Sequence, residues 1–102
     1  MTVLTEVLEE RERQIFKYGD PDLSVVEFIS LITEELGEAA TAANDYHHQL
    51  PYEMDGETFE YDRNPMIQQS RIRKYRQELV QVAAMAVQAV ETLDKQKLID
   101  QQ

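Results

Sequence analysis

The stretch S-V-V-E-F-I-S-L-I-T-E-E-L-G-E-A-A-T-A-A, residues 24–43, decides the fold of this chain. Most of it is apolar, so a helix here is expected to lie in the core, yet Glu34, Glu35 and Glu38 fall within five of its residues. Clustered carboxylates repel one another and are costly to remove from water, so a buried group of them needs a cation to persist. The stretch therefore predicts a core helix that carries a divalent-metal site.

The start of this helix is well marked. Ser24 and Glu27 have the spacing of a capping box, and Leu23 is placed to pack on Phe28 as a hydrophobic staple. We expect the helix to span about residues 24–45.

The same helix is predicted to be amphipathic. Glu35 falls at the margin of its apolar stripe, between Leu31 and Ala42, while Glu34 and Glu38 lie on the polar side. The expected stripe consists of Val25, Phe28, Ile29, Ile32, Leu36, Ala39, Ala40 and Ala43.

Two more helices are predicted, over about residues 2–18 and 65–97. Apolar residues recur at helical spacing in both, Gly19 and Pro21 end the first, and Asn64-Pro65 begins the second as a cap followed by proline. The stripe expected in the last helix consists of Ile72, Tyr75, Leu79, Val82, Ala86, Val90 and Leu93, widened by Val80, Ala83 and Val87.

The remaining segment, 46–64, is predicted to be an ordered loop with a short hairpin around Asp55-Gly56. Its first histidines, His47 and His48, are either surface loop residues or metal ligands. Adjacent histidines point in different directions and no third ligand of the zinc type is evident, which favours the surface interpretation.

The 102 residues are expected to form one domain, 1–102, of the all-α class. A chain of this size gains useful burial from a second copy, so we expect the helices over 24–45 and 65–97 to lie antiparallel and to complete a four-helix-bundle core by dimerisation. We therefore expect the protein to assemble as a homodimer or a homotetramer.

The charge and the apolar runs of the sequence limit the classes of partner that the protein is expected to bind. Twenty acidic and ten basic residues give a formal charge of −10, which opposes binding to nucleic acid or to an anionic membrane. No apolar run has membrane-spanning length, the first residues have no basic region typical of a signal peptide, and there is no cysteine. We expect a cytoplasmic protein that binds neither membrane nor nucleic acid.

The acidic residues suggest a site that spans two helices. Glu34 and Glu38 are one helical turn apart and Glu35 and Glu38 are three residues apart, so both pairs can converge beside the helix. Glu78 lies at the margin of the apolar stripe in the last helix. Gln81 could add an amide oxygen or bind a metal-bound water. Oxygen ligands of this kind suit Mg²⁺, or Mn²⁺. A solvated acidic helix face is the alternative from the residue pattern alone.

The run E-E-L-G-E at 34–38, followed about forty residues later by E-L-V-Q at 78–81, resembles the MazG-like, all-α nucleoside triphosphate pyrophosphohydrolase superfamily, whose metal site combines EExxE with ExxD. The run E-R-E-R-Q at 10–14 and the run V-E-T-L-D at 90–94 are also similar to small MazG-like proteins of bacteria and phages. The resemblance covers about residues 9–46 and 71–95.

The resemblance implies that Glu35, Glu38 and Glu78 bind Mg²⁺ and that Glu34 binds metal or orients the attacking water. Gln81 departs from the pattern, because the superfamily has aspartate there, and a neutral amide lowers the charge of the site by one and cannot act as a base. The implied phosphate and base contacts are Lys17, Tyr18, Arg73, Lys74 and Arg76. The alternative for the basic residues is that they balance the acidic surface one helical turn away, as Lys74 would with Glu78.

These observations predict a Mg²⁺-dependent pyrophosphohydrolase that converts a nucleoside triphosphate to its monophosphate and pyrophosphate. The alternative is a non-catalytic acidic helical module of the same fold that binds a nucleotide or a protein, and Gln81 is the feature that favours it.

Overall fold

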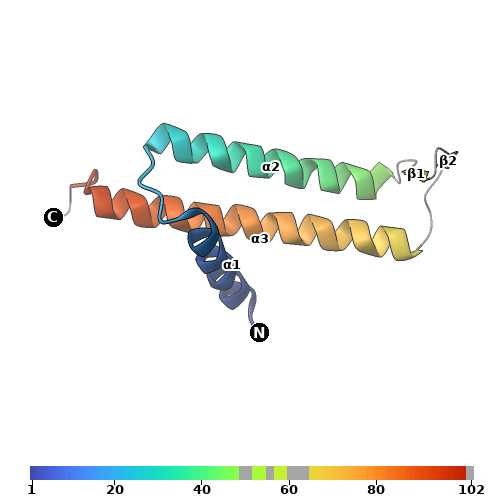
Figure 1. The fold of residues 1–102 in the computed structure, drawn as a ribbon, viewed down its shortest axis with the longest axis horizontal. Coiled ribbons are helices and arrows are strands. Elements are labelled where there is room, and N and C mark those ends of the chain that lie inside the picture. The colour runs from blue at the N-terminus through green and yellow to red at the C-terminus, as the bar shows by residue number, and fades with distance from the viewer. Residues whose placement is uncertain (49–51, 55–56, 60–64, 101–102) are drawn as a thin grey trace.

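The computed structural model describes residues 1–48, 52–54, 57–59 and 65–100, and three helices make up most of it (Figure 1). The predicted all-α class and the three main helices are confirmed. The elements are α1 (Val3–Tyr18), α2 (Val25–His48), β1 (Tyr52–Met54), β2 (Glu57–Phe59) and α3 (Pro65–Gln96).

Helices α2 and α3 lie antiparallel, side by side along most of their length, and the small hairpin connects them at one end (Figure 1). Strands β1 and β2 pair antiparallel with Met54 opposite Glu57, so they flank residues 55–56 as predicted. Helix α1 crosses α3 at an angle, and within the described part of the chain it packs on α3 and not on α2. No helix in this part of the chain combines the length and apolarity that a membrane span needs.

The predicted capping box begins α2. The backbone N–H of Ser24 donates to Oε1 of Glu27, and the backbone N–H of Glu27 donates to Oγ of Ser24, each over 3.2 Å. Helix α1 ends where expected, at Gly19, whose φ of 85° favours glycine and whose N–H donates to the carbonyl of Ile15 over 2.7 Å. Both ends of the α1–α2 connection are therefore defined by local contacts.

Helix α2 continues to His48, three residues beyond its predicted end. No glycine or proline lies between Ala43 and His48, and Pro51 is the next residue that cannot continue a helix. The expectation of a loop at His47 and His48 is therefore wrong, because both belong to the last helical turn, exposed and stacked edge to face with ring centroids 4.8 Å apart. Pro65 is the first residue of α3 as predicted, whereas Asn64 lies outside the described residues.

The inward face of α2 is rotated by about one residue from the predicted stripe. The buried residues of this helix are Phe28, Ala39 and Ala42, and Glu35, which is half-buried, lies on the same face. Several members of the expected stripes are exposed instead. We call the five large ones, which are 40–58% exposed, the open apolar face; they are Val25, Ile29, Leu36, Leu79 and Val90.

The physical reason for this rotation is α1. The buried row of α3 consists of Glu78, Ala84, Gln88 and Thr92, and three of these four side chains are polar. Helix α1 packs on α3 and contacts that row at Gln88, so among the described residues the open apolar face is left without cover.

Polar contacts attach α1 to α3. Arg76 binds both carboxylate oxygens of Glu6 over 2.6 and 3.0 Å, and Arg11 binds both oxygens of Glu91. Between these pairs, Nε2 of Gln88 donates to Oε1 of Gln14, and both glutamines are buried. The contacts satisfy polar groups that would otherwise oppose burial of this face.

Replacing Ser24 with alanine is expected to lower the free energy of unfolding by about 1 kcal/mol, because one orphan N–H at the start of α2 loses its acceptor. Urea denaturation followed by circular dichroism measures the change. Ser30→Ala is the matched control, since Ser30 is exposed within α2 and alanine favours a helix interior. Equal stability of Ser24→Ala and wild type would contradict the role of the capping box.

Candidate metal centre

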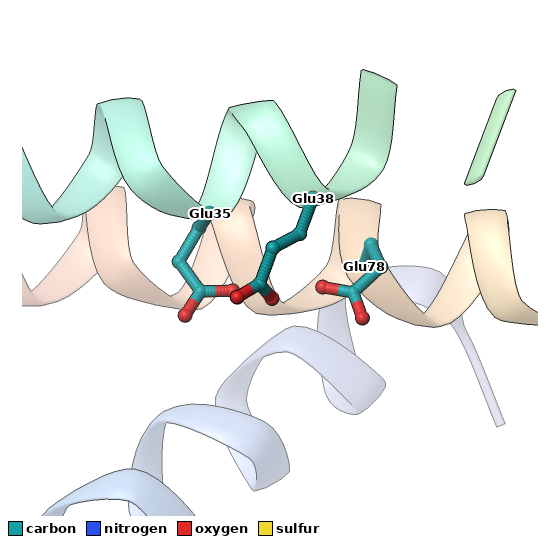
Figure 2. Close-up of side chains that lie close together, drawn as sticks. All are labelled: Glu35, Glu38 and Glu78. Carbon is teal, nitrogen blue, oxygen red and sulfur yellow. The ribbon is translucent and has the colours of Figure 1, made fainter. Parts of the chain in front are cut away.

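Three glutamates converge at the middle of the α2–α3 pair. One carboxylate oxygen from each of Glu35, Glu38 and Glu78 lies within 4.8 Å of the other two. Figure 2 shows all three side chains on the same side of the pair, directed toward α1. No other group of three histidine, cysteine or acidic side chains converges in this way in the described ranges. We call these residues the glutamate trio.

The trio contains two buried oxygens without a partner. Glu78 is only 2% exposed, and its Oε1 forms an ion pair with Nζ of Lys74 over 2.8 Å, while its Oε2 has no hydrogen-bond partner. Oε2 of Glu35 is also buried and unpartnered. An unsatisfied buried carboxylate oxygen is strongly unfavourable, so both atoms indicate space for a cation. The residues present fit a hard divalent ion that takes oxygen ligands.

The electrostatics of Glu35 agree with this arrangement. Burial raises the pKa of Glu35 above its ordinary value of 4.5, and the negative charges of Glu38, Glu78, Glu34 and Glu10 raise it further. The hydrogen bond to Glu78 raises the pKa of Lys74. Lys74 contacts the trio through its ion pair with Glu78, yet the pKa of Glu35 remains raised.

A cavity adjoins the trio on the side of the β-hairpin. Its volume is about 600 Å³, and it reaches the trio at Glu38 and Glu78. Its other walls carry two cations, two hydroxyl groups, one further carboxylate and one alanine, namely Arg71, Lys74, Thr41, Ser70, Asp45 and Ala42. We call it the hairpin-side cavity. Donors of these types suit the oxygens of a phosphate chain.

A second cavity, of about 390 Å³, reaches the trio at Glu35 from the other direction. It lies between the end of α1, the connection to α2 and the inward faces of α2 and α3, and we call it the loop-side cavity. Its polar walls include Gln14 and Gln88, and its apolar walls include Phe28 and Met85. The trio therefore lies between two cavities of different character.

Glu34 and Gln81 are not part of the trio. Glu34 is exposed and lines a shallow groove with Glu27 and Ser30 on the outer side of α2, although its charge contributes to the raised pKa of Glu35. Gln81 is half-buried on α3, one turn after Glu78. The structure thus brings together the three expected metal ligands and leaves the expected catalytic glutamate at the edge.

The basic residues singled out in the sequence separate into different environments. Lys74 joins the trio by the ion pair with Glu78 that the alternative interpretation predicts, and Arg76 is engaged by Glu6 of α1. Arg73 is exposed. Nζ of Lys17 lies over the ring of Tyr18, 5.1 Å from its centroid, and Tyr18 itself lines the loop-side cavity.

Sequence reasoning missed several residues around the trio. Gln88 interrupts the apolar run A-A-M-A-V-Q-A-V at 83–90, and this signal could have identified it, since a polar residue in a core stripe has the same unusual position as Glu78. Thr41 carries a similar signal, since it interrupts the alanine run A-A-T-A-A at 39–43, whereas Gln14 and Ser70 follow polar residues and carry none.

Comparison with known proteins identifies no relative: no family model, no curated protein and no solved structure matches this chain. The function of the site has to be inferred from its own residues.

Replacing Glu35 with glutamine is expected to change how stability depends on pH. Because the folded-state pKa of Glu35 is raised, the native carboxyl holds a proton that the unfolded chain releases, so the contribution of Glu35 to stability falls as pH rises from about 4.5 through the raised value. Wild type should therefore lose free energy of unfolding relative to Glu35→Gln across this interval. Urea denaturation in metal-free buffer at a series of pH values measures the difference.

The matched control is Glu12→Gln, which alters an exposed glutamate of α1 and should follow the wild-type pH profile. A constant difference between wild type and Glu35→Gln over the whole interval would show that Glu35 ionises as an ordinary carboxyl.

Proposed function

We propose that this protein is a Mg²⁺-dependent nucleotide pyrophosphohydrolase, which cleaves a nucleoside triphosphate to the monophosphate and pyrophosphate. The observation that carries the proposal is the pair of buried, unpartnered oxygens, Oε2 of Glu35 and Oε2 of Glu78, within a trio of carboxylates that already converges. The resemblance of the E-E-L-G-E run to MazG-like enzymes implies the same reaction.

Glu35, Glu38 and Glu78 would hold the ion, and Mg²⁺ is preferred over softer metals because all three ligands are carboxylate oxygens. Mn²⁺ is the alternative for the same reason. When bound, the ion supplies positive charge to the phosphate chain and Lewis acidity for phosphoryl transfer. The formal charge of the chain is −10, so cations at the site are a requirement for any phosphate ligand.

The hairpin-side cavity supports binding of the triphosphate. Lys74 borders both this cavity and the trio, and its side chain is 60% exposed, so its ammonium group can turn from Glu78 toward a phosphate oxygen. Arg71 and the hydroxyl of Ser70 lie on the same walls and would bind and orient the chain. This arrangement would place the α-phosphorus beside the trio.

Glu34 is proposed to orient the attacking water and to accept its proton. The oxygen of that water forms a bond to the α-phosphorus, the bond from the α-phosphorus to the bridging oxygen breaks, and pyrophosphate leaves in line. Two observations support this role: Glu34 is adjacent to Glu35 in the sequence, and its negative charge raises the pKa of Glu35. Its exposed carboxylate would have to turn from the outer groove toward the trio.

We also propose that a second copy covers the open apolar face. A continuous apolar flank along two packed helices is typical of a subunit interface, and its burial against the same flank of another copy would complete a four-helix bundle. A dimer or a dimer of dimers is the expected assembly, and the cytoplasm the expected location.

A non-catalytic nucleotide- or protein-binding module is the second candidate, and Gln81 favours it. Without a carboxylate at this position the site has one negative charge less than the MazG-like pattern, and metal affinity falls accordingly. Calorimetric titration with Mg²⁺ and Mn²⁺ distinguishes the candidates, because absence of binding at millimolar concentration would favour the module.

Glu35→Gln and Glu78→Gln are each expected to lower the rate of pyrophosphate release at least about 100-fold, since each substitution removes a charged oxygen from the ion's ligands. Pyrophosphate release from a panel of nucleoside triphosphates with Mg²⁺ measures the effect. Glu34→Gln should lower kcat while leaving Mn²⁺ affinity unchanged.

The control for these variants is again Glu12→Gln, an exposed glutamate outside the site, which should retain wild-type turnover. Circular dichroism should show that each variant keeps the helical content of the wild type. Unchanged pyrophosphate release in folded Glu35→Gln or Glu78→Gln would refute the proposed function.

Ile29→Glu is expected to convert the proposed dimer to a monomer, because a charged group in the middle of an apolar interface would have to be desolvated. Sedimentation equilibrium over a concentration series measures the mass. Leu8→Glu is the matched control, since Leu8 is an apolar residue of α1 outside the open apolar face and is 52% exposed, compared with 56% for Ile29. A wild-type chain that remains monomeric at every concentration contradicts the proposed bundle.

A further inference from the structure

The loop-side cavity is the part of the molecule that the proposed reaction does not yet use. It reaches the trio at Glu35, whereas the hairpin-side cavity reaches it at Glu38 and Glu78. A substrate with its phosphate chain in the hairpin-side cavity and its α-phosphorus at the trio would therefore extend its other end into the loop-side cavity. The residues that line the loop-side cavity therefore indicate the chemical nature of the part of the substrate opposite its phosphate chain.

Most of the lining is apolar or aromatic. Phe28 and Leu31 of α2 face Met85 of α3, and Tyr18 borders the cavity from the end of α1. Apolar walls with an aromatic ring at the edge suit a flat heteroaromatic group, since such a ring gains from stacking and from removal of its faces from water. The volume of about 390 Å³ is sufficient for one such group.

Two buried amides add hydrogen-bonding capacity to these walls. Gln14 is 7% and Gln88 5% exposed, and both line the cavity. Nε2 of Gln88 donates to Oε1 of Gln14, which holds the Gln88 amide in one orientation. Oε1 of Gln88 accepts no hydrogen bond from the described residues, so the wall offers a ligand an acceptor oxygen on a residue that is itself buried.

We propose that the loop-side cavity binds the base of the nucleotide and that Gln88 is its specificity-determining residue, with Oε1 accepting a hydrogen bond from an amino group of the base. This inference rests on the proposed function and names its substrate class: a nucleotide whose base presents an amino donor. A site built to accept a hydrogen bond discriminates against an analogue with a carbonyl in that position, because two acceptors then face each other. Cytosine is preferred to uracil, and adenine to hypoxanthine.

The experiment compares kcat/KM for pyrophosphate release within two matched substrate pairs, CTP with UTP and ATP with ITP, whose members exchange an amino group for a carbonyl. Wild type should prefer the amino member of each pair by about tenfold or more. Gln88→Met keeps the length of the side chain but removes the amide, and it should abolish this preference.

Gln96→Met is the matched control. Gln96 is another glutamine of α3 that donates to the α1–α2 connection, at Asp22 and at the carbonyl of Leu23, and it does not line the loop-side cavity. This variant loses comparable structural hydrogen bonds and should keep the wild-type preference. If Gln88→Met does not fold, Tyr18→Leu replaces it, because Tyr18 is 75% exposed and its substitution leaves the core unchanged. Loss of stacking on Tyr18 should raise KM for all four nucleotides about tenfold. KM for ribose 5-triphosphate, which has no base, should stay unchanged.

Equal kcat/KM within both pairs, or preference for the carbonyl member, overturns the assignment while the proposed function stands. If no nucleotide releases pyrophosphate, the proposed function fails and the cavity is tested by calorimetric titration with CTP and UTP in the presence of Mn²⁺. Tighter binding of CTP that Gln88→Met removes and Gln96→Met retains would support the base site. Equal binding of CTP and UTP, or binding of neither, would overturn it.

Discussion

The structure depends on how three negative charges are tolerated where α2 meets α3. Glu78 is almost fully buried, and among the described residues one of its two oxygens pairs with Lys74 while the other has no hydrogen-bond partner. The pKa of Glu35 is raised, because burial and the neighbouring acidic residues oppose its ionisation. A buried charge that lacks full compensation destabilises a fold, so this arrangement is understandable where binding of a cation supplies the missing charge. The position of the trio in the centre of the helix pair then determines what its two adjoining cavities can hold.

The two flanks of the α2–α3 pair differ in composition and in what covers them. The polar flank carries the trio and the glutamine at position 88, and α1 covers it through ion pairs and an amide contact. The apolar flank has no cover within the described chain and exposes Ile29, Leu36 and Val90. This division explains why a helix as polar as α1 packs on the chain's own core while the more apolar flank remains open. It also links the proposed dimer to the proposed site, since a second copy on the open flank would hold α2 and α3 at the spacing on which convergence of the trio depends.

The two cavities that adjoin the trio are lined by different types of side chain. Cationic, hydroxyl and carboxylate groups line the hairpin-side cavity, and apolar groups with two buried amides line the loop-side cavity. A nucleotide has the same order of parts, from phosphate chain to base. The geometry thus relates the proposed reaction and the proposed base selection through one shared residue, Glu35, which contacts the loop-side cavity and belongs to the trio.

The local sequence is sufficient for the helices, for the capping box at Ser24 and for the spacing that aligns Glu35 with Glu38, because each depends on residues within about one turn. The unusual place of Glu78 in an apolar stripe also pointed to the position where it meets the other two. Burial could not be read in this way: Leu79 and Val90 fit a core stripe by periodicity yet are exposed, since periodicity identifies an apolar flank but not the element that covers it. Only the packing of α1 on α3 decided that a polar row is buried, that Arg76 binds Glu6, and that Gln14 and Gln88 meet across 74 positions of sequence. These contacts join distant segments, so no local rule of propensity or spacing contains them.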